Sequence, residues 1–157
     1  MDHTRWLDAE EMRMWTAFLG AGTLVDRELD LQLKEETGLT HLQYGIMAAL
    51  SDSPRGAMRM TELAERLINS KSGLTYQVGQ LEKAGLVRRK PCDWTRGIVA
   101  ELTDEGRAAL ERAAPGHVAK VREVIVDVLT PEERRVIADA LGRVRDRLLE
   151  GEEGTCW

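Results

Sequence analysis

Apolar residues recur near a 3.6-residue period at both ends of the chain, and this pattern predicts long amphipathic helices there. The first helix is expected over residues 6–35, with two glycines weakening its middle. Its apolar positions are Trp6, Leu7, Met12, Trp15, Phe18, Leu19, Leu24, Val25, Leu29 and Leu33. Residues 104–129 show the same period, but the Pro115–Gly116 pair should kink or interrupt that helix.

A last helix is predicted to follow Thr130, because a capping threonine, Pro131 in the first turn and Glu133 together form a strong start signal. One face of this helix carries Val136, Ile137, Ala140, Leu141, Val144 and Leu148. A core of about 80 residues cannot cover the apolar stripes at both ends of the chain. We therefore expect these stripes to pack against a second copy in a twofold dimer.

Shorter helices are predicted in the middle of the chain. After a break at Gly38, Thr40 and Gln43 form a capping box, and the helix they start should stop before Ser53–Pro54. Thr61 is the expected N-cap of a short helix that follows.

The next helix is predicted to begin after Ser70 and to end at Gly85. Leu74, Val78 and Leu81 lie at helical spacing on one stripe and should be buried. The opposite side carries small or hydrogen-bonding residues, namely Ser72, Thr75, Tyr76, Gly79 and Gln80.

Residues 86–90 and 96–103 read as two short strands joined by a turn at Pro91–Thr95, which together form a β-hairpin. The predicted fold is mainly α with this small hairpin: a winged helix-turn-helix flanked by N- and C-terminal dimerisation helices. Its expected parts are residues 1–36 for the first dimerisation helix, 37–103 for the DNA-binding domain and 104–157 for the C-terminal dimerisation helices.

Charge changes the picture of the partner. The net charge of −5 argues against a polyanion, but the distribution is uneven. Between Lys71 and Gly97 there are six basic residues and only two acids, Glu82 and Asp93, so this segment carries +4 and the rest of the chain −9. Phosphate contacts act within about 10 Å. The local basic patch therefore predicts binding to nucleic acid.

Composition supports an ordinary globular protein, with 43% hydrophobic and 31% charged residues. No apolar run approaches the roughly 20 residues of a membrane span, and the first residues lack the layout of a secretory signal. A cytoplasmic location is expected, with no membrane partner.

Little chemistry for catalysis or metal binding is visible. Cys92 and Cys156 are far apart and form no CxxC pair, and His3, His41 and His117 show no metal-binding spacing. There is no glycine-rich cofactor loop and no acid–base or nucleophile constellation. We expect no metal, no cofactor and no enzymatic activity, and the chain leaves no residues for a catalytic domain such as the one that follows a winged-helix dimerisation domain in some methyltransferases.

A helix about 10 Å across fits the roughly 12 Å major groove, and a basic hairpin beside it can reach phosphates or the minor groove. In these features the chain resembles the MarR family of winged-helix transcriptional regulators. The resemblance is carried by MTELAERLINSKSGLTYQVGQLEKAGLVRRK, an arginine at the wing tip and the closing LTDEGRAAL, and the element order matches over residues 6–150.

The resemblance implies a homodimer with interlocked terminal helices that binds palindromic double-stranded operator DNA, usually as a repressor. It also implies that a small, often aromatic, effector relieves binding. Arg96 corresponds to the wing-tip arginine. The residues expected to face the groove are Ser70, Ser72, Thr75, Tyr76 and Gln77. Outside that set, the basic neighbourhood adds Lys71, Lys83, Arg88, Arg89 and Lys90 as candidate phosphate contacts.

The wing departs from the family pattern at one place. The family commonly has an aspartate two residues before the arginine, where it orients the guanidinium. Here Trp94 occupies that position and Asp93 lies one residue earlier. A shift of one residue in the turn would let Asp93 reach Arg96.

Three other interpretations stay open. Cys92, near several arginines that favour its thiolate, could act as a redox switch, although oxidation-sensing members of the family carry their cysteine near the N-terminal helix. The winged helix could instead bind only a protein. Aromatic and methionine side chains either line an effector cleft, where we expect Trp15 and Tyr44, or form core and dimer interface; the others are Trp6, Met12, Met14, Phe18 and His41.

Overall fold

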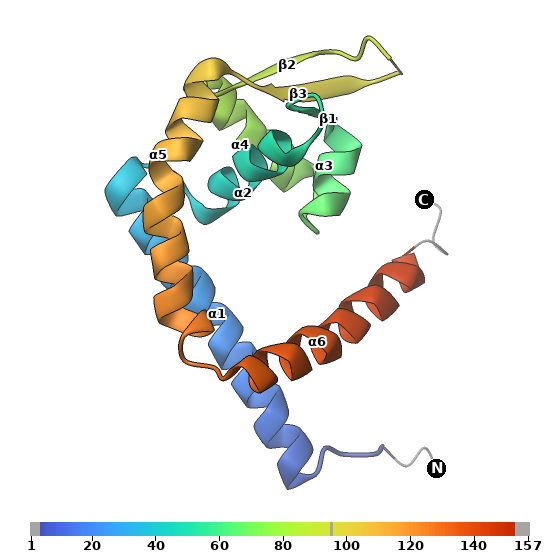
Figure 1. The fold of residues 1–157 in the computed structure, drawn as a ribbon. Coiled ribbons are helices and arrows are strands. Elements are labelled where there is room, and N and C mark those ends of the chain that lie inside the picture. The colour runs from blue at the N-terminus through green and yellow to red at the C-terminus, as the bar shows by residue number, and fades with distance from the viewer. Residues whose placement is uncertain (1–3, 95, 153–157) are drawn as a thin grey trace. The chain divides into compact units, whose positions relative to one another are not determined.

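The computed structural model describes residues 4–94 and 96–152. Its helices and strands (Figure 1) are α1 (Ala9–Thr37), α2 (His41–Asp52), β1 (Ala57–Arg59), α3 (Met60–Arg66), α4 (Lys71–Lys83), β2 (Val87–Pro91), β3 (Ile98–Leu102), α5 (Asp104–Val121), the π-helix η1 (Arg122–Val126) and α6 (Pro131–Glu152). The predicted class, mainly helical with a small sheet in a winged helix, is confirmed. The chain forms two compact units that meet at Lys120–Val121.

Helix α1 begins later than the sequence pattern predicted, because Asp8 is its N-cap. The Asp8 carboxylate accepts hydrogen bonds from the amides of Glu10 (2.9 Å) and Glu11 (2.8 Å), and the Glu11 carboxylate accepts one from the Asp8 amide (2.9 Å). At the other end Gly38 adopts φ = 76°, the left-handed conformation that glycine takes at a helix C-terminus. The predicted break at Gly38 and the capping box that starts α2 are both confirmed.

The sheet has three strands, one more than the predicted hairpin. Its order is β1-β3-β2 with both pairings antiparallel, and Ala57 lies opposite Glu101. The extra strand, β1, spans only three residues, which is too short to show an alternating pattern. The prediction of Thr61 as the N-cap of α3 is wrong, because α3 begins at Met60 and the Glu62 carboxylate accepts from the Arg59 amide (3.3 Å).

The core of the first unit lies between α2, α3, α4 and the sheet. Its buried members are Leu39, Ile46, Met47, Ala49, Leu50, Leu63, Ala64, Leu74, Val78, Leu81, Val87, Ala100, Leu102 and Leu110. The predicted buried stripe of α4 is confirmed, since Leu74, Val78 and Leu81 are each at most 1% exposed. This packing fixes which face of α4 is left for a partner.

Pro115 was predicted to kink or to interrupt the helix; the interruption does not occur, because α5 continues through Pro115, and the kink stays a prediction. A proline lacks one amide donor and leaves the carbonyl of Glu111 without its usual helical partner. Both residues lie at the exposed surface, where water can satisfy that oxygen. The helical pattern changes instead at η1, where the Asp127 amide donates to the Arg122 carbonyl (2.9 Å).

Helix α6 starts as predicted. The Glu133 carboxylate accepts from the Thr130 amide (2.8 Å), and the Thr130 hydroxyl accepts from the Glu133 amide (3.3 Å). None of the described side chains of α6 is buried. Its exposed apolar residues are Val136, Ile137, Leu141, Val144, Leu148 and Leu149.

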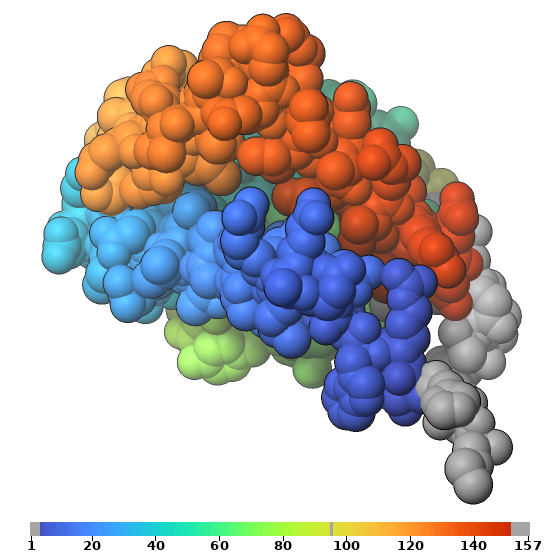
Figure 2. Space-filling view, turned by 90° about the horizontal axis from the view of Figure 1, so that it is seen from below, coloured from blue at the N-terminus to red at the C-terminus, as the bar shows by residue number. Residues whose placement is uncertain are grey.

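The N-terminal half of α1 is exposed in the same way (Figure 2, blue), because the only buried residues of α1, Leu29, Gln32 and Leu33, lie in its C-terminal half. The large apolar side chains exposed on or just before this half are Trp6, Leu7, Met12, Met14, Trp15, Phe18 and Leu19. No helix in the described part of the chain is long and apolar enough to cross a membrane.

The packing of α5 against the sheet leads to a prediction about Gly106. An added Cβ at this buried residue would collide with the Leu86 carbonyl oxygen and lie 2.8 Å from Cδ1 of Leu102. We expect Gly106→Ala to lower the free energy of unfolding by about 1–3 kcal/mol, measured by chemical denaturation. Gly142→Ala is the control, because no atom lies within 4 Å of its added Cβ, and it should raise stability by up to about 1 kcal/mol. Equal effects of the two variants would contradict this account.

Candidate nucleic-acid interface

Helix α4 presents a polar face opposite its buried stripe. The Ser70 hydroxyl caps the helix by accepting from the Gly73 amide (3.1 Å), as predicted. Four of the five residues expected at the groove are exposed, namely Ser70, Ser72, Thr75 and Tyr76, and so is Lys71, a predicted phosphate contact. Tyr76 is the most apolar of them and is 63% exposed. This face is therefore free to contact a partner through short, hydrogen-bonding side chains.

Gln77 differs from the rest of the predicted groove set. It is half-buried, and its Oε1 accepts a hydrogen bond from Nε2 of Gln43 (3.0 Å) on α2. This contact ties α4 to the first turn of α2. In the structure Gln77 thus links α4 to α2, and its side chain is not free in the way that those of Thr75 and Tyr76 are.

The cations along β2 are paired within the protein. The Arg88 guanidinium and the Lys90 ammonium (3.1 Å) both contact the Glu101 carboxylate on β3, and Arg88 Nε lies 3.2 Å from it. Hydrogen bonds from Arg88 and then Lys90 hold the pKa of Glu101 below its ordinary value. The net charge of +4 was summed over residues 71–97 and therefore does not include the Glu101 carboxylate.

Arg89 points to the other side of β2 and is paired as well. Its guanidinium lies 3.0 Å from the Glu82 carboxylate of α4, which also accepts from the Arg89 amide (2.8 Å). These hydrogen bonds lower the pKa of Glu82. These contacts attach β2 to the C-terminal end of α4. Three of the predicted phosphate contacts, Arg88, Arg89 and Lys90, are consequently partly neutralised.

Three predicted contacts keep uncompensated charge. Lys71 and Lys83 flank α4, and Arg96 lies at the wing tip; all three are exposed. Within residues 4–94 and 96–152, no carboxylate lies within 4.0 Å of any of them. These cations are the part of the predicted basic patch most available to a polyanion.

The wing tip is closed without an aspartate–arginine pair. The Cys92 amide donates to the Gly97 carbonyl (2.9 Å), and Gly97 has φ = 120°, a conformation that favours glycine. No ion pair between Asp93 and Arg96 is formed in the described residues, so the suggestion that Asp93 holds the arginine has no support. Thr95, part of the predicted turn, lies outside the described residues.

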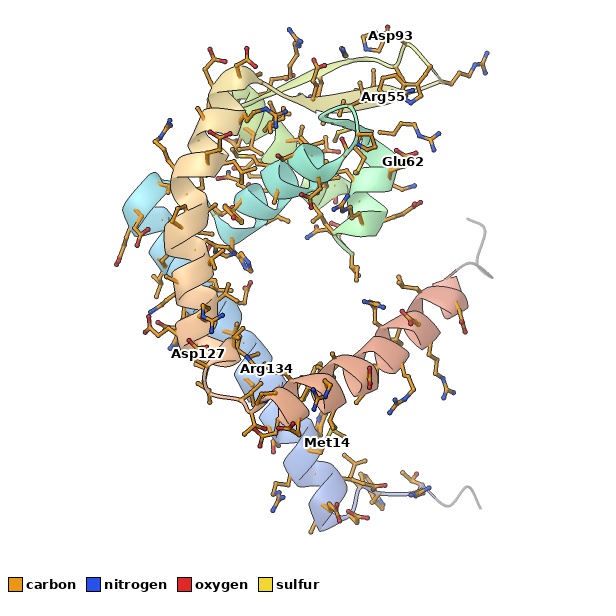
Figure 3. All side chains as sticks on the ribbon, viewed as in Figure 1. Met14, Arg55, Glu62, Asp93, Asp127 and Arg134 are labelled. Atoms are coloured by element: carbon orange, nitrogen blue, oxygen red, sulfur yellow. The ribbon has the colours of Figure 1, made fainter. Side chains whose placement is uncertain are left out.

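Trp94 instead contacts an arginine that the sequence analysis did not select. The Cζ of Arg55, from the turn between α2 and β1, lies 4.5 Å from the centroid of the Trp94 ring. Figure 3 shows Arg55 beneath the wing and Asp93 at its tip. The signal for Arg55 was the Ser-Pro-Arg-Gly turn at 53–56, which was used only to end a helix. The strand that follows this turn, β1, was not predicted, and its pairing with β3 is what brings the turn close to the wing.

Cys92 is half-buried at the start of the wing turn and is a free thiol. The redox interpretation of Cys92 stays a prediction, and Cys156 lies outside the described residues. In the described part of the chain no three histidine, cysteine, aspartate or glutamate side chains are grouped so that they could hold a metal ion.

The two expected effector residues lie in separate clusters. Tyr44 packs on His117 of α5 with ring centroids 4.2 Å apart, and His117 lies 5.5 Å from His41. Trp15 contacts Phe18 at 6.2 Å on α1. His41 is fixed to α1 through Asp26 (2.8 Å), eleven residues beyond Trp15 or about 16 Å along the helix.

The Tyr44 cluster contains polar atoms without partners. Among the described residues, Nδ1 of His117 and Oε1 of Gln32 are buried and accept or donate no hydrogen bond. Gln32 Nε2 donates to Glu36 (2.7 Å), and both side chains pack closely against Gly116. Burial, with a smaller effect from His41, lowers the pKa of His117. Unsatisfied buried polar atoms are costly and are a feature of sites that receive a ligand or water.

Several known proteins are similar to this chain. The family model described as "MarR family" matches residues 37–93. The chain is 43% identical to Sco3205 of Streptomyces coelicolor, a MarR family transcriptional regulator solved in complex with DNA, over 91% of this chain and 94% of that one, with a TM-score of 0.88. It is 31% identical to the HTH-type transcriptional regulator PecS of Dickeya dadantii (strain 3937), over 91% of this chain and 86% of the relative. It is 33% identical to the HTH-type transcriptional repressor YetL of Bacillus subtilis (strain 168), over 71% and 66%.

The lowered pKa of His117 predicts a pH dependence of stability. The folded protein takes up this proton less readily than the unfolded chain, whose histidines titrate near about 6.5. Stability is therefore complete above that pH and falls as the pH drops through and below it. His117→Phe keeps a ring on Tyr44 but has no proton to bind. We expect its free energy of unfolding to fall less than that of the parent between pH 8 and pH 5, and equal losses would contradict the assignment.

Proposed function

This chain belongs to the MarR family of transcriptional regulators, and on that premise we propose that it is a homodimeric repressor that binds a palindromic operator in duplex DNA and is released by a small aromatic effector. The observation that carries the proposal is the exposed polar face of α4 beside Lys71, Lys83 and Arg96, which have no carboxylate within 4.0 Å in the described part of the chain.

DNA binding is supported by the side chains that α4 and the wing present to a partner. Thr75, Tyr76 and Ser72 are short or planar side chains that can hydrogen-bond to base edges from a helix in the major groove. Lys71 and Lys83 lie at the two ends of the same helix, where they can meet phosphates on either side of the groove. Arg96 extends from the wing tip, in reach of the neighbouring minor groove or backbone.

Dimerisation is supported by the exposed apolar faces of α1 and α6. Monomeric soluble proteins rarely leave a contiguous apolar surface of this kind uncovered. Leu141 and Leu148, at the centre of the α6 face, are 43% and 67% exposed. A second copy of the chain presents the same faces, and a twofold arrangement covers both at once. It also places two recognition helices on successive half-sites about one turn of DNA apart.

Effector binding is supported by the cluster around Tyr44. The rings of Tyr44, His117 and His41 offer stacking surfaces to a planar molecule. The unpaired Oε1 of Gln32 can accept a hydrogen bond from it. Trp15 lies outside this cluster, so it could bind an effector only at a separate site.

The DNA-binding proposal predicts the effect of Arg96→Ala. Loss of a charge-assisted contact should weaken binding to a duplex selected by the parent protein from a random library by at least about tenfold. Arg112→Ala is the control, because Arg112 is also exposed but lies on α5, and it should bind like the parent. Both would be measured by fluorescence anisotropy at physiological salt. Unchanged affinity of Arg96→Ala would refute the role of the wing.

The dimer proposal predicts the effect of a charge on the apolar face of α6. Leu141→Glu buries a carboxylate in the interface and should raise the dimer dissociation constant at least about tenfold. Gly142→Glu adds the same side chain about 100° around the helix from Leu141, where no described atom lies within 4 Å of an added Cβ, and should weaken the dimer less than Leu141→Glu does. Sedimentation equilibrium would detect the change from twice the 17.6 kDa chain mass to a single copy. A monomeric parent protein would overturn the proposal.

A further inference from the structure

The turn that carries Arg55 is fixed by hydrogen bonds on both sides. The Ser53 hydroxyl lies within hydrogen-bond distance of the carbonyls of Leu50 (2.9 Å) and Ala57 (3.0 Å), and the Gly56 amide donates to the Ser53 carbonyl (3.1 Å). The Gly56 carbonyl in turn accepts from the Leu102 amide on β3 (2.9 Å). The backbone of the turn is thus hydrogen-bonded to the central strand of the sheet, and this fixes the position of the Arg55 Cα.

The guanidinium of Arg55 is held over the indole of Trp94. Its Cζ lies 4.5 Å from the ring centroid, within the range of a cation–π contact. Trp94 is 43% exposed, so one part of the ring packs while the other faces solvent. This contact joins the tip of the wing to the turn before β1 through two side chains whose backbones lie 39 positions apart in the chain.

The contact leaves the hydrogen-bonding capacity of Arg55 unused. The guanidinium has five N–H donors, and within the described residues none of them forms a hydrogen bond to a protein acceptor. Arg88 and Arg89 direct those groups at Glu101 and Glu82. Arg55 has no carboxylate within 4.0 Å among the described residues. It keeps a full positive charge and an exposed row of donors at the wing.

We propose that Arg55 is a contact to the DNA backbone and that Trp94 is the residue that positions it. A planar guanidinium with free in-plane donors suits a phosphate, which it can bind through two parallel hydrogen bonds. Trp94 takes the place of an acid in orienting an arginine at the wing, but the arginine that it orients comes from a different turn. The inference rests on the proposed DNA-binding function.

Arg55→Gln tests the contact. It should lower affinity for the duplex selected by the parent protein about tenfold, and lower the slope of log affinity against log salt by about 1.8, the value for two lost phosphate contacts, one from each copy in the dimer. Arg55→Lys keeps the charge and should retain the slope. Arg112→Gln, on α5, should match the parent in both. Affinity of Arg55→Gln within twofold of the parent, with an unchanged slope, would overturn the contact.

Trp94→Leu tests the positioning. It keeps apolar bulk but removes the aromatic face, so affinity should fall about threefold to fivefold, and Trp94→Phe should restore most of it. The double variant Arg55→Gln/Trp94→Leu should bind no worse than Arg55→Gln alone, because both changes remove one contact. If the double variant instead loses affinity by the product of the two single-variant factors, the positioning role of Trp94 is overturned. Circular dichroism melts of each variant should match the parent, since both side chains are exposed.

The failure of this inference can be told apart from the failure of the proposed function. If the parent protein selects no duplex, DNA binding itself is refuted, and the inference with it. If the parent binds and Arg96→Ala weakens binding while Arg55→Gln does not, only the inference is refuted.

Discussion

Strand β3 is the element on which the rest of the winged helix depends. It is the middle strand of the sheet, and Val99 and Ala100 on it are fully buried. Its Glu101 contacts two of the three cations of β2, and its Leu102 amide donates to the turn before β1. Strand β3 contacts both β2 of the wing and the turn that carries Arg55, and it also leads directly into α5. Burial of a few small apolar residues thus fixes polar groups well away from the core.

Much of this fold could be read from the sequence, because its helices follow rules that act over a few residues. The caps at Thr40, Ser70 and Thr130 were each identified from a hydroxyl and its neighbours, and the buried stripe of α4 from its period. These signals are local, and so the sequence carries them in full. The errors arose where the outcome depends on contacts between distant segments. Strand β1 exists through its pairing with β3, and three residues hold no pattern of their own.

The candidate interface shows the same division. The exposure of Ser72 and Thr75 followed from helical spacing, whereas the pairing of Arg88 and Lys90 with Glu101 needed the register of β2 on β3. Pro115 failed as a helix breaker because the orphan carbonyl lies at the surface, which the local sequence does not reveal. The partner of Trp94 was hidden for a similar reason, since Arg55 precedes it by 39 residues.

The internal pairing of the wing cations has a consequence for how such a protein would search a genome. Affinity for random DNA comes from the total number of phosphates neutralised and does not depend on sequence. Carboxylates that occupy Arg88, Arg89 and Lys90 reduce that number, and the net charge of −5 opposes long-range attraction. A regulator built in this way would release non-operator sites quickly, and its residence on DNA would depend on the few donors aimed at one sequence.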